Sequence, residues 1–173
     1  MSCATRLGQS RDCTRRVRYA TSVRAVIDTS TWISCARAGL LTLVDHCALD
    51  VVTLDVVHAE AVTAGVAGGY ADATVVEAAL AGRPVTVTPA AATPDAAVLQ
   101  AADEAGLLVT NDLALGRRAR NMGIAWLRTA DLVIVAVRAD AISESDGRDA
   151  LAALRDAGRI TAALAEDYLE ELR

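Results

Sequence analysis

Residues 23–33 set the organisation of this chain, because a short apolar run gives way there to polar residues with helix-starting character. The run at 23–27 has the β-branched composition of a strand, and Asp28, Thr29 and Ser30 follow it directly. In an open parallel α/β sheet, ligands bind beyond the carboxyl ends of the strands. An acid at the point where a strand ends and a helix begins therefore faces the expected binding edge.

Composition favours the same architecture. The chain has 173 residues, of which 53% are hydrophobic, and a mean hydropathy of +0.32, so it can bury the core of a single domain. Only 3% of the residues are aromatic and phenylalanine is absent. A core of Ala, Val, Leu and Ile suits buried parallel strands covered by Ala-rich helices. We therefore predict an α/β fold with a central parallel sheet in three layers.

Alternation of strand-like and helix-like segments continues along the chain. Further strands are expected at 50–53, 83–88, 107–110 and 124–127. The expected helices cover 30–38, 40–47, 54–64, 71–81, 93–105, 111–122 and 129–137, with a loop at 65–69. Thr29 or Ser30 is the expected N-cap of the first of them. The helix at 93–105 has the strongest start, because Thr93 supplies an N-cap, Pro94 the first helical position and Asp95 an acid in the first turn.

The two ends of the chain differ from this pattern. Residues 1–22 form an arginine-rich arm that we expect to be disordered. Residues 23–138 form the α/β domain. From Ser143 onward no strand is predicted, and two amphipathic helices broken at Gly158 are expected instead. We assign 139–173 to a helical extension that packs on the domain or on a partner.

Charge excludes several functions. All 17 basic residues are arginines, so a P-loop is excluded because its signature requires lysine, and a phospho-receiver domain is disfavoured for the same reason. Residues 1–24 hold six arginines against Asp12, a charge of +5, whereas the remainder sums to −10. An acidic body disfavours nonspecific binding to long nucleic acid. It remains compatible with a nucleic-acid substrate if its acids surround metal ions, because bound cations invert the local field.

Cysteine usage points to a reducing compartment. The chain contains no Cys-x-x-Cys pair and only two histidines, His46 and His58, which argues against a zinc cluster. Reduced thiols and a cytoplasmic location are the expectation. No apolar run is long enough to span a membrane, and the first 22 residues lack the apolar stretch of a secretory signal. The four cysteines are Cys3, Cys13, Cys35 and Cys47.

Four acids recur at related positions of the pattern. Asp28 and Asp112 follow strands and Asp95 opens a helix, so all three are expected at the carboxyl edge of the sheet. Glu60 is expected on the buried face of the helix at 54–64, together with Val57. Each acid alone has an ordinary structural explanation, as a helix cap or as a charge that favours the helix dipole. Their combination suggests a shared site.

These segments resemble the PIN-domain ribonucleases, the family that includes the VapC-type toxins of toxin–antitoxin pairs. The resemblance covers about residues 23–130, and the helical tail, with Gly147 and the run 157–160, is similar to a prokaryotic PIN-like subgroup that carries such an extension. The motifs that carry the resemblance are Val26-Ile-Asp28-Thr29-Ser30, Glu60, Asp95-Ala-Ala-Val-Leu-Gln-Ala-Ala and Leu108-Val-Thr110-Asn111-Asp112.

The resemblance implies a metal-dependent phosphodiesterase. The four acids Asp28, Glu60, Asp95 and Asp112 would hold one or two Mg²⁺ or Mn²⁺ ions through carboxylates and waters, as hard cations prefer. Ser30 would orient a water molecule or the scissile phosphate. Further substrate contacts are expected from Thr110, Asn111, Arg117 and Arg118.

Partners also follow from the resemblance. It implies an RNA substrate, a homodimer and a small antitoxin protein. Two alternative functions are compatible with the same residues. One is a noncatalytic PIN-like module that binds protein, and the other is a nuclease directed at DNA, because the metal chemistry does not require a 2′-hydroxyl.

Overall fold

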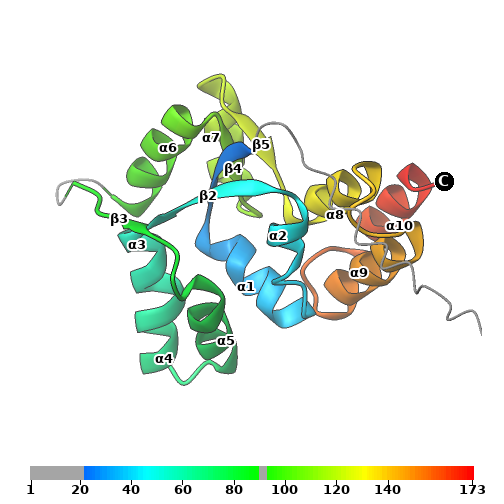
Figure 1. Cartoon of the computed structure of the whole chain (residues 1–173), viewed down its shortest axis with the longest axis horizontal. Helices are drawn as coiled ribbons and strands as arrows, with labels where there is room; N and C mark the ends of the chain where they lie inside the picture. Colours follow the sequence, from blue (N-terminus) through cyan, green and yellow to red (C-terminus); the bar gives the residue numbers. More distant parts are fainter. Residues whose placement is uncertain (1–21, 90–92) are drawn as a thin grey trace, which may run out of the picture.

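A computed structural model describes residues 22–89 and 93–173. Its centre is a five-stranded, all-parallel sheet in the order β3-β2-β1-β4-β5 (Figure 1). The predicted α/β fold with a central parallel sheet is therefore confirmed. The arm predicted at 1–22 lies outside the described residues except for Ser22. The strands are β1 (Val23–Ile27), β2 (Leu49–Leu54), β3 (Val85–Thr86), β4 (Leu107–Val109) and β5 (Ala125–Leu127).

Strand β1 is the middle of the sheet and pairs on both sides. Val26 lies opposite Val52 of β2 on one side and Leu108 of β4 on the other. The last three residues of β1 are buried, and so is the whole of β4, as expected for strands covered on both faces. Because all pairings are parallel, the carboxyl ends of the strands share one edge.

Helices cover both faces of the sheet. Figure 1 shows α6 and α7 on one side, and α1 with α3 to α5 on the other. The helices are α1 (Thr29–Ala38), α2 (Leu43–His46), α3 (Asp55–His58), the π-helix η1 (Ala59–Ala64), α4 (Gly65–Ala67), α5 (Ala71–Leu80), α6 (Pro94–Ala105), α7 (Leu113–Asn121), α8 (Thr129–Arg138), α9 (Glu144–Asp156) and α10 (Ala162–Glu171). None of them, within the described ranges, is long and apolar enough to cross a bilayer.

Two local predictions differ from the structure. The helix expected to end at residue 64 continues through α4, so the loop predicted at 65–69 is helical as far as Ala67. Gly65 permits this continuation, since a Cβ there would lie 2.7 Å from Cβ of Ala73 in the helix packed against it. The strand expected at 83–88 is reduced to the two residues of β3, which pairs with β2 at the edge of the sheet.

The start and end of α6 were predicted correctly, whereas the N-cap of α1 is Asp28 and not Thr29 or Ser30. Asp28 caps α1, with its side chain accepting from the Ser30 amide, and Thr93 caps α6 in the same way through the Ala96 amide. Gly106 ends α6 at a φ of 89°, which is the left-handed conformation that a glycine reaches without steric cost.

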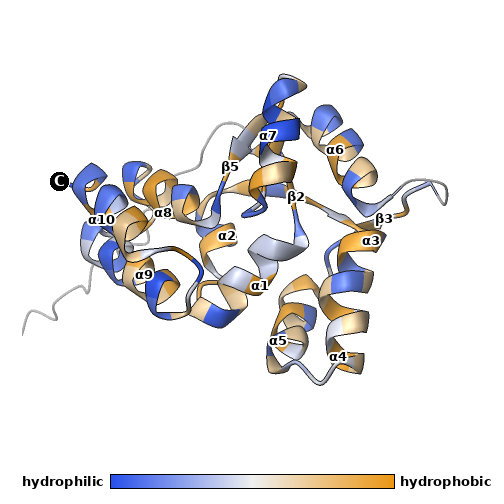
Figure 2. Ribbon diagram, turned by 180° about the vertical axis from the view of Figure 1, so that it is seen from behind, coloured by the Kyte–Doolittle hydropathy of each residue, from blue (hydrophilic) through white to orange (hydrophobic). Residues whose placement is uncertain are grey.

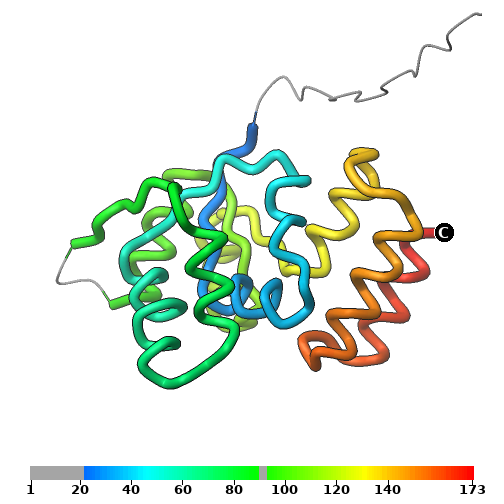
Figure 3. The backbone as a smooth tube through the Cα atoms, turned by 60° about the horizontal axis from the view of Figure 1, so that its bottom comes forward, coloured from blue at the N-terminus to red at the C-terminus, as the bar shows by residue number. Residues whose placement is uncertain are grey.

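The helical extension packs on the domain and shares its core. Leu151 and Leu154 of α9 are fully buried in the same cluster as Val133 of α8. Tyr168 of α10 donates to Oδ1 of Asp131 in α8, 2.5 Å away, and burial raises the pKa of this phenol. Figure 2 shows blue and orange alternating along α9 and α10, as in amphipathic helices. Figure 3 shows the extension beside α8, at the opposite end of the molecule from α4 and α5.

The cysteines in the described part of the chain are free thiols. Burial, with a smaller contribution from Cys47, raises the pKa of Cys35 to about 12. Burial also raises the pKa of Cys47 to about 11, and its Sγ–H donates to the carbonyl of Leu132. Both groups are therefore protonated packing residues at neutral pH. Cys3 and Cys13 lie outside the described residues.

Gly116 of α7 lets the Trp126 ring of β5 lie directly on the helix. A Cβ at Gly116 would lie 2.0 Å from Cε2 of Trp126, and the indole is fixed by its Nε1–H bond to the Thr110 carbonyl, 2.9 Å. We predict that Gly116→Ala lowers the free energy of unfolding by about 1–3 kcal/mol, despite the better helix propensity of alanine. Urea unfolding measures this.

A Trp126→Leu background supplies the control for this clash. There the cost of Gly116→Ala should fall, because the coupling between contacting residues is removed. A Gly116→Ala protein that is as stable as the wild type would contradict this packing.

Candidate functional site

Asp28 forms the centre of the candidate site. Its Oδ2 accepts from the Ser30 hydroxyl at 2.8 Å and from the Thr110 hydroxyl at 2.9 Å, with a longer bond of 3.4 Å from the Ser30 amide. Among the described residues, Oδ1 of Asp28 accepts no hydrogen bond. One of the two carboxylate oxygens is thus held in place by the protein.

Parallel strand pairing brings these residues together. The Asp28 amide donates to the Val109 carbonyl at 2.9 Å, and the Thr110 amide donates to the Leu127 carbonyl at 2.9 Å. The residues that follow β1 and β4 therefore continue the ladder by one step, with the last residues of β4 and β5 as acceptors. Residues more than 80 positions apart in the chain meet at this edge, as expected for the carboxyl ends of adjacent parallel strands.

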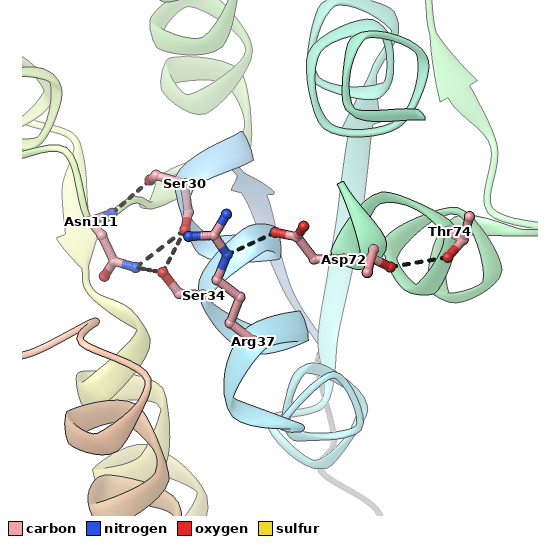
Figure 4. Close-up of polar contacts among 7 residues, drawn as sticks. Ser30, Ser34, Arg37, Asp72, Thr74 and Asn111 are labelled. Carbon is pink, nitrogen blue, oxygen red and sulfur yellow. Dashed lines mark hydrogen bonds and ion pairs between the residues drawn. The ribbon is translucent and has the colours of Figure 1, made fainter. Parts of the chain in front are cut away.

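Asn111 ties the strand ends to the helices behind them. Its amide nitrogen Nδ2 donates to Ser34 at 2.9 Å and to Thr129 at 2.7 Å, and its Oδ1 accepts from the Thr129 amide at 3.1 Å. Its backbone amide donates to the Ser30 hydroxyl at 3.0 Å. Figure 4 shows Asn111 reaching Ser30 and Ser34 of α1. The side-chain amide of Asn111 is thus bound within the protein. Its backbone amide positions the Ser30 hydroxyl.

Glu60 reaches the site from the π-helix η1. Its Oε2 accepts from the Thr29 hydroxyl at 3.0 Å, which places it beside the residue that follows Asp28. The side chain is exposed, so the prediction that it shares the buried face of the helix is wrong. The wider turn of η1 buries Ala61 and Val62 instead. Single-turn π segments occur frequently at functional sites.

The other two predicted acids are engaged in local contacts. Oδ1 of Asp112 accepts from the amides of Ala114 and Leu115 at 2.7 and 3.0 Å, and so caps α7. Asp95 pairs with Arg118 at 2.8 Å, and both side chains are more than half exposed. Arg117 is exposed on α7. An exposed ion pair contributes little energy and exchanges readily, so Asp95 and Arg118 are free to take other partners.

The donor set suits a hard cation only in part. Within residues 22–89 and 93–173, no three His, Cys, Asp or Glu side chains lie close enough together to ligate one ion. Asp28 and Glu60 nevertheless supply carboxylate oxygens at one edge. Mg²⁺ is commonly held by one or two carboxylates, with waters and substrate phosphates completing its shell. Asp28 and Glu60 carry the ligand chemistry of such an ion, and the Thr29 hydroxyl connects Glu60 to the residue that follows Asp28.

Two cavities adjoin these residues. One of about 330 Å³ is lined by Glu60, Ile33, Tyr70 and the ion pair of Arg37 with Asp72. A second, of about 340 Å³, is lined by Ser30, Ser34, Asn111, Asp112 and Arg159. Another cavity, of about 590 Å³, lies between α2 and the segment joining α8 to α9, and its lining includes none of the predicted site residues. We therefore place the candidate site at the carboxyl ends of the strands, beside the two cavities that Glu60 and Ser30 line.

Several residues at this edge were not predicted. Ser34 and Thr129 hold Asn111, and Ser34 had a recognisable signal, since it lies four residues after Ser30 on one face of α1. Arg159 reaches the site from the extension and had no local signal. Asp55 follows β2 and is a further acid at the end of a strand, the same signal that identified Asp28.

Comparison of the chain with family models, with curated protein sequences and with solved structures gave no significant match.

Asp55, which follows β2, forms hydrogen bonds with Thr88, which lies two residues after β3. Its Oδ1 accepts from the Thr88 hydroxyl at 2.7 Å, the Val56 amide at 2.8 Å and the Thr88 amide at 3.0 Å. The hydrogen bond from the Thr88 side chain is the main reason that the pKa of Asp55 lies below its ordinary value of 3.8. The ionised form is thus favoured in the folded protein.

We predict that Thr88→Val raises the pKa of Asp55 toward 3.8. A depressed pKa stabilises the fold above the unfolded-state pKa, and this contribution is lost as the pH falls through the folded-state pKa. The variant should therefore lose more stability at neutral pH than in acid. NMR titration of the carboxyl carbon and urea unfolding at both pH values measure this. Thr86→Val is the control, and an equal effect of both changes would contradict the assignment.

Proposed function

We propose that this protein is a metal-dependent endoribonuclease whose centre is Asp28. The observation that supports this most is the asymmetric environment of its carboxylate. Hydroxyls of Ser30 and Thr110 hold Oδ2, while Oδ1 is left without a partner from the described residues. Hydrogen bonds of this kind orient a metal ligand and are characteristic of the surroundings of metal sites.

Asp28 and Glu60 would hold the ion, and Thr29 and Ser30 would keep both carboxylates in place. Bound there, Mg²⁺ or Mn²⁺ supplies a water of lowered pKa and charge stabilisation for a phosphodiester. Ser30 acts on Asp28, because its hydroxyl donates to Oδ2 and accepts from the Asn111 amide. Asp95 would join the site after exchanging Arg118 for the ion or a water, and Arg118 would then be available to phosphate.

The assignment to RNA, the toxin role and the homodimer rest on the resemblance of these motifs to the PIN-domain ribonucleases. A toxin with a small antitoxin partner in the cytoplasm is the form of this proposal that the resemblance supports.

A noncatalytic protein-binding module is the second candidate function. It is favoured by the engagement of Asp95 with Arg118 and of Asp112 with the first turn of α7. In such a module the acids would serve as salt-bridge partners and helix caps, and Asp28 would remain as the cap of α1.

We predict that purified protein cleaves single-stranded RNA with Mg²⁺ or Mn²⁺ and not with EDTA. Asp28→Asn, which keeps the capping acceptor, and Glu60→Gln should each lower kcat/KM by about 100-fold or more, since the charge that holds the ion is removed. Ser30→Ala should lower it by about 10–100-fold, as expected for a residue that orients a ligand. Gel-resolved cleavage of a labelled oligonucleotide measures these effects.

Asp50→Asn is the matched control for this series. Asp50 is an exposed aspartate of β2 that pairs with Arg24 near the amino ends of the strands, away from Asp28. Its replacement should therefore leave cleavage unchanged. A DNA strand of the same sequence, run in parallel, separates a ribonuclease from a DNA-directed enzyme. Folded protein that shows no metal-dependent cleavage of either strand would leave the binding module as the function.

The toxin role makes a separate prediction. Induced expression of the wild-type chain in bacteria should arrest growth, while equal amounts of the Asp28→Asn protein should not, because arrest depends on cleavage. Growth curves with immunoblots for equal expression measure this. Arrest by both proteins would show that toxicity arises from something other than the site.

A further inference from the structure

We propose that Arg159 of the helical extension binds a backbone phosphate of single-stranded RNA beside Asp28, so that the extension forms part of the substrate site. This inference rests on the proposed function. It starts from the cavity of about 340 Å³ in which Arg159 meets Ser30, Asn111 and Asp112. Arg159 is the only cationic residue of that lining.

The backbone of Arg159 is held firmly. Gly158 ends α9 with a φ of 67°, and the Arg159 amide donates to the Leu154 carbonyl at 2.8 Å. Leu154 and Leu151 are fully buried in the core shared with α8. The short segment between α9 and α10 is therefore fixed relative to the sheet, and the arginine starts from a defined position.

The guanidinium of Arg159 has no carboxylate partner among the described residues. Most arginines of the extension and of the helix before it are paired, as Arg138 is with Glu171 and Arg155 with Asp156. Arg159 is only partly exposed, and Asp112 lines the same cavity without forming an ion pair with it. A guanidinium carries five N–H donors in a planar fork that matches a phosphate.

The neighbours of Arg159 favour a phosphate as its ligand. The cavity opens beside Ser30, whose hydroxyl contacts Asp28 directly. A strand with one phosphodiester at Asp28 necessarily presents further phosphates nearby. Oδ1 of Asp112, the acid of this lining, accepts from the first turn of α7. The other lining groups, the hydroxyls of Ser30 and Ser34 and the amide of Asn111, are polar and uncharged, as is common in contacts to the sugar-phosphate backbone. Contacts to phosphate position a strand without reading its sequence.

The test separates binding from catalysis. In the Asp28→Asn background with EDTA, fluorescence anisotropy of a labelled single-stranded RNA measures Kd over a range of salt concentrations. Arg159→Gln should weaken binding about tenfold, as expected for the loss of a charged hydrogen bond. It should also reduce the slope of log K against log salt by about 0.7, the contribution of one phosphate on a single strand. Arg159→Lys should recover the slope.

Arg148→Gln is the matched control. Arg148 lies toward the other end of α9 and pairs with Glu144, so its loss removes the same charge from the extension without touching the cavity. With Asp28 present, Arg159→Gln should raise KM for RNA cleavage, whereas Arg148→Gln should not. Circular dichroism and thermal unfolding confirm that the variants are folded.

Three outcomes are informative. An unchanged salt slope and KM in Arg159→Gln would overturn this inference while leaving a cleaving wild type, and so the proposed function, in place. A lower kcat with an unchanged slope would also overturn it, because Arg159 would then act through Asp112. RNA binding that depends on Arg159 without any cleavage would refute the nuclease and retain the phosphate site.

Discussion

Parallel pairing of β1 with β4 is the constraint on which the site depends. It places the residues that follow Ile27 and Val109 side by side, so that Asp28 and Thr110 share a hydrogen bond although they are far apart in the chain. The pairing is secured by burial of both strands between two layers of helices. Asp28 is thereby held at the carboxyl ends of the parallel strands.

The carboxylates of Asp28 and Glu60 are held by hydroxyl groups and not by charged side chains of the described residues. Thr29, Ser30 and Thr110 each donate to the carboxylate of Glu60 or Asp28, and neither carboxylate forms an ion pair with an arginine in the part of the chain that the structure describes. A hydroxyl orients an anion without neutralising it, whereas an arginine in the same place would compete with a metal ion. Asp95, which does pair with Arg118, is the acid whose environment is least like this.

The helical extension shares one hydrophobic core with the α/β domain. Leu151, Leu154 and Tyr168 belong to the same hydrophobic cluster as the helices of the α/β domain. Because this core is continuous, the turn after α9 has a fixed position against the sheet edge, and Arg159 reaches the same cavity as Ser30. A segment that looks like an appendage along the chain is part of the folded unit.

The sequence by itself determined the layer architecture and most helix ends. The strand at 23–27, the cap at Thr93 and the end of the helix before Gly106 depend on periodicity and on contacts a few residues apart, which a linear chain displays. It also indicated which acids would stand at strand ends, although Asp55, which carries the same signal, was overlooked.

Only the tertiary structure decided which contacts each of these acids makes. Asp28 and Glu60 are linked through Thr29, whereas Asp112 is held by its own helix and Asp95 by an arginine of α7. Glu60 is exposed, while Ala61 and Val62 of the π-helix η1 are buried. Arg159 lines the cavity beside Ser30 because α9 packs on the core that it shares with α8. These outcomes depend on contacts between segments distant in sequence, and such contacts leave no periodic pattern in the chain.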